Sequence, residues 1–284
     1  MLNITEKIKL LGIVPVVKID DENKAVPLAE ALCRGGLPCA EITFRTNAAE
    51  ESIRRVADAL PDMLVGAGTV LTPAQADKAK AAGAKFIVSP GLNPNVVEHC
   101  KNINMPIFPG CSSPSDIEKA LELGLTCVKF FPAEQAGGIA AIKAMSAPYG
   151  NISFMPTGGV NAKNLNDYLS FDKVIACGGS WMVDAALINS GDFSAIEELT
   201  RSAVFTMLGF AYKPGGNPEF GGYIEMTGET IAIRANYLDR AVYFLKSIGI
   251  KFKENSAVYN AKGKMTAIYL ENKTGGFDVR FVQG

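Results

Sequence analysis

The chain has 284 residues, of which 48% are hydrophobic, and its formal net charge is -1 at pH 7. This balance excludes a bulk electrostatic attraction to nucleic acid or to an anionic membrane surface, so local groups must meet any charged substrate. The length fits one barrel-sized domain, alone or with a small additional domain.

Six cysteines are present, and their positions give no C-x-x-C pair and no spacing typical of a metal site. No secretory leader precedes them, and Pro15 and Lys18 interrupt the first apolar run before it approaches membrane-spanning length. We therefore expect a cytoplasmic protein with reduced thiols and no membrane partner. The cysteines are Cys33, Cys39, Cys100, Cys111, Cys127 and Cys177.

Short apolar or β-branched runs alternate with helical patterns from the N-terminus to about residue 204. Eight such runs, each followed by a helix-like segment, predict an α/β fold, a (β/α)8 TIM barrel over residues 1–204. A doubly wound open sheet is the alternative, but no glycine-rich dinucleotide turn follows the first run. The predicted strands begin near Ile13, Cys39, Met63, Lys85, Pro106, Thr126, Ile152 and Lys173.

Capping residues and glycines mark the ends of the predicted helices. Thr72 precedes a proline, an arrangement that predicts a helix over residues 73–82. Ser115, with Glu118 three residues later, predicts the start of another helix. Three glycines end helices before the next strand, namely Gly36, Gly83 and Gly124.

The second predicted strand carries two charged residues on one face. A strand period of two places Glu41, Thr43 and Arg45 together, with Ile42 and Phe44 on the opposite face. If the apolar face packs under the helices, the carboxylate and the guanidinium enter the barrel lumen together. Burying either charge without a partner or a ligand is costly, and taken alone the pattern fits a structural Glu–Arg pair better than a catalytic site.

The sixth predicted strand contains Lys129 as a single cation in the apolar run 126–132. Loss of hydration favours the neutral amine, which is the nucleophile that Schiff-base enzymes use. A lysine that reaches solvent from a strand end explains the pattern equally well. The strand period places Cys127, Lys129 and Phe131 on one face, so the amine can meet Glu41 inside the barrel.

Glycine-rich turns follow three of the predicted strands. Gly66 to Thr69 ends the third strand, where small residues allow a ligand to approach the backbone, although a plain turn is the alternative. Thr157 to Val160 and Cys177 to Ser180 end the seventh and eighth strands. Because TIM barrels commonly hold phosphate at those two places, these turns favour a phosphate site over two ordinary tight turns.

His99 is the only histidine, and it lies in a segment that reads as a surface helix. A histidine-dependent triad or a histidine-rich zinc centre is therefore excluded, and proton transfer must fall to carboxylates, lysine or water. Metal-dependent aldol chemistry is disfavoured for the same reason. Trp181, after the eighth predicted strand, fits a packing residue better than a platform for a ligand.

The sequence pattern changes after Val204, where a turn-rich stretch at residues 213–218 precedes a strand, a helix and further strands. We predict strands at 230–234, 264–270 and 277–282 and a helix at 237–247. Residues 205–284 are therefore expected to form a small α+β domain.

Taken together, residues 1–204 resemble the bacterial 2-keto-3-deoxy-6-phosphogluconate (KDPG) / 4-hydroxy-2-oxoglutarate (KHG) aldolases, a family of class I aldolases. Several separate motifs match in family order and with family-like spacing. They are Glu41 to Thr46, Gly66 to Val70, Ser89 to Gly91, Val128 to Glu134, Pro156 to Gly159 and Gly178 to Trp181.

The resemblance implies a role for each matched position. Lys129 resembles the lysine that forms the Schiff base, and Glu41 resembles the acid/base that acts through a water molecule. The groups that look like ligands of the pyruvyl carboxylate are Arg45, Thr69 and Thr157, with Pro90 and Phe131 as pocket walls. The residues that resemble the phosphate cradle are Gly158, Gly159 and Ser180. The family also implies a homotrimer, with no cofactor and no metal.

The activity implied by the resemblance is the cleavage of 2-dehydro-3-deoxy-6-phosphogluconate, a keto-acid phosphate of the Entner-Doudoroff pathway, to pyruvate and glyceraldehyde 3-phosphate. Within the same class, 4-hydroxy-2-oxoglutarate, which yields pyruvate and glyoxylate, and 2-dehydro-3-deoxy-6-phosphogalactonate are alternative substrates. A non-catalytic keto-acid sensor is the alternative of a different class. It fits less well because pure binding has little use for both Glu41 and Lys129.

The pattern after residue 205 resembles one βαβββ half of a glyoxalase, or vicinal-oxygen-chelate, module. Such modules often bind metal through histidine and glutamate, but this segment contains no histidine, so we expect no metal there. The segment is expected to serve dimerisation, assembly or ligand sensing, and a packing appendage is an equally good interpretation.

Overall fold

The computed structural model describes residues 2–210 and 224–284. The chain divides into two compact units, Met1–Thr200 and Arg201–Gly284, and each unit has its own β-sheet. The turn-rich stretch predicted at residues 213–218 lies outside the described residues. Within the described part, every helix is too short or too polar to cross a membrane.

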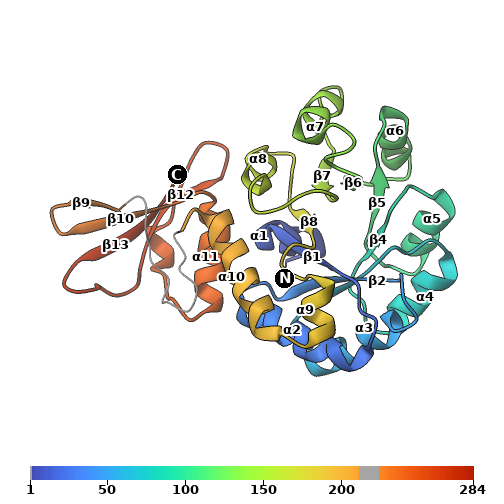
Figure 1. Cartoon of the computed structure of the whole chain (residues 1–284). Coiled ribbons are helices and arrows are strands. Elements are labelled where there is room, and N and C mark those ends of the chain that lie inside the picture. The colour runs from blue at the N-terminus through green and yellow to red at the C-terminus, as the bar shows by residue number, and fades with distance from the viewer. Residues whose placement is uncertain (1, 211–223) are drawn as a thin grey trace. The chain divides into compact units, whose positions relative to one another are not determined.

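In residues 2–200, eight parallel strands form a barrel in the order β7-β6-β5-β4-β3-β2-β1-β8 (Figure 1). Parallel bridges from Phe154 to Val174 and from Thr157 to Gly178 join the two ends of this order. The predicted TIM barrel is therefore confirmed, and the open sheet is excluded. The strands are β1 (Ile13–Val17), β2 (Cys39–Thr43), β3 (Leu64–Gly68), β4 (Ile87–Ser89), β5 (Ile107–Cys111), β6 (Cys127–Phe130), β7 (Ser153–Pro156) and β8 (Cys177–Gly179).

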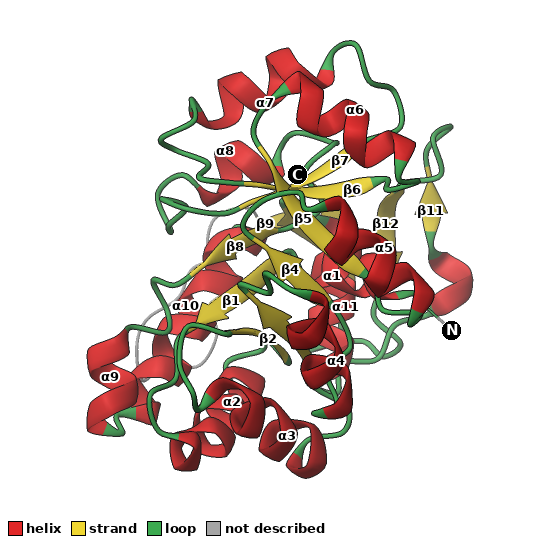
Figure 2. Ribbon diagram, turned by 90° about the vertical axis from the view of Figure 1, so that its right-hand side faces the viewer, coloured by secondary structure: helices red, strands yellow, loops and turns green. Residues whose placement is uncertain are grey.

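Helices surround the barrel strands (Figure 2). Their apolar residues recur at helical spacing, as in Leu28 and Leu32 of α2 or Ile53 and Val56 of α3, and these side chains are buried. The helices are α1 (Ile4–Leu11), α2 (Ala25–Arg34), α3 (Ala49–Ala59), α4 (Pro73–Ala81), α5 (Pro94–Asn102), α6 (Pro114–Glu122), α7 (Gly138–Ser146), α8 (Leu165–Leu169) and α9 (Ala185–Ser190), with the short 3-10 helix η1 (Glu22–Lys24). Helix α10 (Phe193–Leu208) begins in the first unit and ends in the second.

Two of the predicted element boundaries are wrong. Helix α6 is capped by Ser113 and Asp116, not by Ser115 and Glu118, because Pro114 already occupies the first helical turn. Strand β8 begins at Cys177, four residues later than expected, since the preceding segment contributes only an isolated bridge. The cap predicted at Thr72 is confirmed, with its side chain accepting a hydrogen bond from the Gln75 backbone N–H at 3.2 Å.

In residues 224–284, five strands form a mixed sheet in the order β11-β12-β13-β10-β9. Strands β10 and β13 are parallel, and the other neighbours are antiparallel. The strands are β9 (Ile224–Thr227), β10 (Thr230–Ala235), β11 (Val258–Tyr259), β12 (Met265–Tyr269) and β13 (Asp278–Gln283), with helix α11 (Leu238–Ser247) and the 3-10 helix η2 (Glu254–Ser256). The predicted α+β character is confirmed, whereas β9 and β11 were not predicted.

Phenylalanines form the core of the second unit. Phe281 of β13 contacts Phe210 and Phe252 edge-on, and Phe205 contacts Phe210 and Phe244 in the same way, with ring centroids 5.7–6.4 Å apart. Phe281 is 2% exposed. Such aromatic contacts add stability beyond the burial of apolar area, so this cluster stabilises the interior of the unit.

Candidate active site

Lys129 and Glu41 meet inside the barrel, as the strand period predicted. Lys129 lies on β6 and Glu41 on β2, and the distance from Lys129 Nζ to Glu41 Oε1 is 3.5 Å. Their side chains are only 6% and 1% exposed, so the alternative of a solvent-reaching lysine is wrong. Neither Glu41 oxygen has a hydrogen-bond partner among the described residues. Burial of a carboxylate without protein hydrogen bonds is costly, so stability alone does not explain Glu41 at this position.

Gly68 makes room for the Glu41 carboxylate. The two residues lie on neighbouring strands, and a Cβ atom built on Gly68 would lie 2.3 Å from Glu41 Oε1. At Gly66 a Cβ would lie 2.3 Å from the Phe86 ring. Protein side chains thus take the space that a Cβ would fill at both glycines, and the approach of a ligand to the backbone of this segment stays a prediction.

A cavity of about 370 Å³ opens next to this pair at the carboxyl ends of the strands. Thr43 and Phe131 line it; Thr43 lies two residues beyond Glu41 on the same face of β2, and Phe131 directly follows β6, the strand of Lys129. Lys129 Nζ lies 5.0 Å from the centroid of the Phe131 ring. The aromatic wall and the amine thus form the inner end of one site.

Both predicted glycine turns line this cavity. Gly158 and Gly159 adopt positive φ angles of 100° and 81°, which favour glycine, and Ser180 follows β8 on the adjacent wall. A Cβ on Gly178 would lie 2.3 Å from Thr157 Oγ1, so the turns pack against each other through small residues. The structure therefore brings Thr157, Gly158, Gly159 and Ser180 together, as the sequence indicated.

The turn at Gly158 is fixed by the segment that follows β6. Backbone N–H groups of Ala133 and Glu134 donate to the carbonyl oxygens of Thr157 and Gly158, at 2.8 and 3.0 Å. The hydroxyl of Tyr168 donates to a carboxylate oxygen of Glu134, and its burial and this hydrogen bond raise the Tyr168 pKa. These contacts hold the glycine turn in place without side chains in the cavity itself.

Arg45 lies at the exposed rim and not in the lumen with Glu41. Strand β2 ends at Thr43, so the strand period does not extend to Arg45, whose Nε donates to Thr69 Oγ1 at 3.3 Å. The alternative of a structural Glu41–Arg45 pair also fails, since Glu41 pairs with Lys129. Arg45 lines the cavity, whereas Thr69 and Pro90 are not among its lining residues.

Sequence reasoning missed two charged residues of the cavity wall, Lys18 and Asp184. Lys18 directly follows β1, and this place at a strand end was the signal that could have found it. The Asp184 side chain caps helix α9 by accepting a hydrogen bond from the Ala186 backbone N–H at 2.8 Å.

The remaining candidates lie outside the site or serve packing. His99 contacts Asp77 at 2.8 Å on the helical shell. A Cβ on Gly179 would lie 1.9 Å from the Trp181 ring, which therefore packs directly on the backbone there. No cluster of three or more potential metal ligands of the His, Cys, Asp or Glu type exists within residues 2–210 and 224–284. Burial raises the pKa of the Cys127 and Cys111 thiols to about 12.

Comparison with known proteins agrees with this geometry. A model of the family described as KDPG and KHG aldolase matches residues 4–199. A 2-dehydro-3-deoxy-phosphogluconate aldolase of Treponema pallidum is 48% identical over 204 residues, which are 72% of this chain and 97% of that protein. The KHG/KDPG aldolase of Escherichia coli is 41% identical over 192 residues, which are 68% of this chain and 90% of its own length.

A solved structure extends the similarity to three dimensions. The KDPG aldolase of Legionella pneumophila, with pyruvate captured at low pH as a covalent carbinolamine intermediate, has 38% sequence identity and a TM-score of 0.68. The match covers 70% of this chain and 97% of that one. The chain belongs to the KDPG and KHG aldolase family.

Proposed function

We propose that this protein is a class I aldolase that cleaves 2-dehydro-3-deoxy-6-phosphogluconate to pyruvate and glyceraldehyde 3-phosphate. The observation that carries the proposal is the buried contact of 3.5 Å between Lys129 Nζ and Glu41 Oε1, next to a cavity lined by two glycine turns. This pair supplies the amine nucleophile and the carboxylate acid/base that a Schiff-base aldolase requires.

The reaction begins at the C2 ketone. Lys129 gives a proton to Glu41 and attacks C2, and Glu41 returns this proton to the carbinolamine hydroxyl, which leaves as water and gives a protonated imine that draws electrons from the bond between C3 and C4. Glu41, directly or through a water molecule, removes the proton of the C4 hydroxyl. The bond between C3 and C4 breaks, glyceraldehyde 3-phosphate leaves, and the electron pair forms an enamine. Protonation at C3 and addition of water then release pyruvate and regenerate Lys129.

The other cavity residues position the two ends of the substrate. Arg45, held by Thr69, supplies a fixed positive charge for the pyruvyl carboxylate, together with the Thr157 hydroxyl. Phe131 serves as a wall of the pyruvyl pocket, whereas the same role for Pro90, which does not line the cavity, is supported by the family resemblance alone. Backbone N–H groups at Gly158 and Gly159, with the Ser180 hydroxyl, receive the phosphate at the outer end.

Release of pyruvate from the phosphorylated substrate, coupled to lactate dehydrogenase, tests this function. We expect turnover without added metal or cofactor. Binding of keto acid without aldehyde release would instead support the non-catalytic sensor. Borohydride reduction in the presence of pyruvate should add one pyruvate-derived mass at Lys129, and an adduct at another residue would overturn the assignment.

A second candidate substrate is 4-hydroxy-2-oxoglutarate, which the name of the Escherichia coli relative supports. It needs the inner end of the site but not the phosphate cradle, so the two glycine turns favour the phosphorylated substrate. The galactonate epimer differs only in configuration at C4, where placement of the base decides the preference. Comparing kcat/KM for the three substrates ranks them.

We further propose a cytoplasmic homotrimer in which residues 205–284 form an accessory domain for assembly, dimerisation or ligand sensing. The trimer is supported by family membership. The accessory domain is supported by the element order β10-α11-β11-β12-β13, which matches the βαβββ order of a glyoxalase-like half-module. Light scattering of the full-length protein tests the trimer, because a monomer or dimer would contradict it.

A further inference from the structure

The cavity walls carry few charges for the substrate proposed above. Among the described residues that line the cavity, the charged side chains are Lys18, Arg45 and Asp184. The substrate brings a carboxylate and a phosphate, which at pH 7 carries about -1.5 to -2 charge. Arg45 is held beside Thr69 and is assigned to the carboxylate. Lys18 is then the remaining cation on the wall that can oppose the phosphate.

The strand order places Lys18 beside the phosphate cradle. Strand β1 lies between β8 and β2, with Pro15 paired to Gly179 and Val17 paired to Ile42. Lys18 is the first residue after β1, as Ser180 is the first after β8. In a parallel barrel the carboxyl ends of the strands lie at one rim. Lys18 and Ser180 therefore line neighbouring parts of the cavity wall.

Lys18 currently contacts Asp20. The distances from Lys18 Nζ to the two Asp20 carboxylate oxygens are 2.7 and 3.0 Å, and the two side chains are 46% and 44% exposed. An ion pair this exposed contributes little stability, so the ammonium can exchange Asp20 for a doubly charged phosphate. An ordinary surface ion pair without function is the competing explanation, and it gives a different experimental result.

We propose that Lys18 binds the phosphate group of the substrate and selects phosphorylated over unphosphorylated keto acids. The inference rests on the aldolase function proposed above. Backbone N–H groups of the glycine turns supply directed hydrogen bonds, while Lys18 supplies the charge that they lack. Asp20 competes for the same ammonium and therefore weakens phosphate binding.

The test compares the full-length protein with Lys18→Met, which keeps the stem but removes the charge, and with Lys18→Arg, which restores it. For Lys18→Met we expect kcat/KM for the phosphorylated substrate to fall about tenfold, mainly through KM, because one partly exposed charge-assisted contact is lost. The value for 4-hydroxy-2-oxoglutarate should change less than about twofold, since that substrate carries no phosphate. Lys18→Arg should recover most of the loss.

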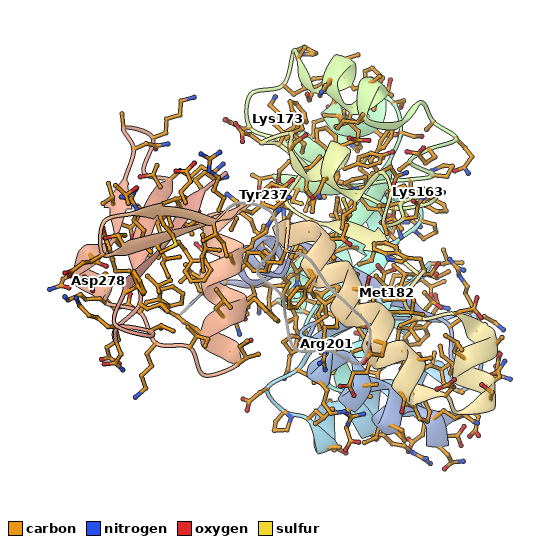
Figure 3. The ribbon with its side chains drawn as sticks, turned by 60° about the vertical axis from the view of Figure 1, so that its left-hand side comes forward. Lys163, Lys173, Met182, Arg201, Tyr237 and Asp278 are labelled. Atoms are coloured by element: carbon orange, nitrogen blue, oxygen red, sulfur yellow. The ribbon has the colours of Figure 1, made fainter. Side chains whose placement is uncertain are left out.

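Two further variants distinguish a direct contact between Lys18 and phosphate from the long-range effect of surface charge. Lys163, labelled in Figure 3, is exposed and does not line the cavity, so Lys163→Met should leave kcat/KM for both substrates unchanged. Asp20→Asn should improve KM for the phosphorylated substrate about twofold, because it frees the ammonium. An equal fall for both substrates in Lys18→Met, or an equal effect in Lys163→Met, would overturn the proposal.

Binding of 3-phosphoglycerate, measured by calorimetry, tests the phosphate contact without turnover. Affinity that falls about tenfold in Lys18→Met supports the inference even if the unchanged protein releases no pyruvate, in which case only the aldolase function has failed. Affinity that is equal in the unchanged protein and in Lys18→Met overturns the inference even if the aldolase activity is present.

Discussion

The two units of this molecule bury charge in different settings. In the barrel, Lys129 and Glu41 form a contact of opposite charges whose side chains are both less than a tenth exposed. In the second unit, the buried charged residue among the described ones is Arg240, which is 7% exposed and lies with its Cζ 4.6 Å from the centroid of the Tyr237 ring. A cluster of phenylalanines packs in the same interior.

This difference distinguishes residues whose role is chemical from residues whose role is packing. A buried ion pair costs desolvation that apolar groups of similar size avoid, so stability alone does not explain Lys129 and Glu41. A phenylalanine cluster needs no further explanation, because burial and edge-on contacts stabilise it directly. The contrast therefore assigns catalysis to the barrel and packing to the core of the second unit.

The largest expected effect that tests this contrast is the loss of the amine. Lys129→Ala should lower kcat by at least roughly 10⁴-fold, because no imine can form. Borohydride should then no longer fix pyruvate to the protein. Lys143→Ala, which removes an exposed lysine of α7, is the matched control and should keep full activity. Substantial activity in Lys129→Ala would show that the buried lysine has a structural role and is not the nucleophile.

The second effect concerns the carboxylate. Glu41→Gln keeps the shape of the side chain but removes its capacity to accept a proton, so kcat should fall roughly 10²- to 10⁴-fold with little change in KM. Steady-state kinetics measure this, with Glu50→Gln on α3 as a control outside the lumen. A fall in kcat of less than tenfold would show that another group serves as the base.

A third experiment perturbs the packing region alone. Phe281→Ala should destabilise the second unit by about 3–5 kcal/mol, because it removes a buried ring from the cluster. Circular dichroism follows the whole chain during unfolding, whereas fluorescence of Trp181, the only tryptophan, follows the barrel. We expect an earlier transition by dichroism and an unchanged one by fluorescence, with kcat also unchanged.

The matched control is Tyr259→Ala, since Tyr259 is 56% exposed and should contribute little. If Phe281→Ala moves the fluorescence transition as far as the dichroism transition, the two units unfold together. The two units would then differ in the composition of their interiors but not in the transition in which they unfold.

The smallest effect is a pH dependence confined to the barrel, because all six cysteines lie at or before residue 177. Burial raises the pKa of Cys127 from 9.0 to about 12 in the folded state. The stability that its protonated thiol contributes is complete below about pH 8.5 and is lost as pH rises toward 12, since the unfolded chain releases the proton first.

The loss due to this one thiol should reach roughly 1.4 kcal/mol at pH 10. Cys127→Ser should flatten the decline of the fluorescence-detected unfolding free energy between pH 8 and 10. An equal slope in both proteins would mean that the thiol contributes nothing to the alkaline loss. The second unit should show no such decline from cysteine.

Particular residues show where sequence reasoning succeeded and where it failed. The strand period placed Glu41 and Lys129 in the barrel lumen correctly because both lie inside regular strands. It failed for Arg45, which lies beyond the end of β2. The side chains of Phe86 and Glu41, which take the space beside Gly66 and Gly68, carried no signal in the sequence. Lys18 was overlooked although it directly follows β1, because its place at a strand end, the signal that could have found it, was not used.

The sequence by itself determined the alternation of strands and helices, the side chains that face inward, and the family to which the chain is similar. These follow from local periodicity and from motifs that are contiguous in the chain. Only the tertiary structure decided that Lys129 lies 3.5 Å from Glu41, that Arg45 stays at the rim, and that Lys18 joins the wall beside Ser180. Closure of the barrel brings together strand ends far apart in sequence, and no local pattern encodes those distances.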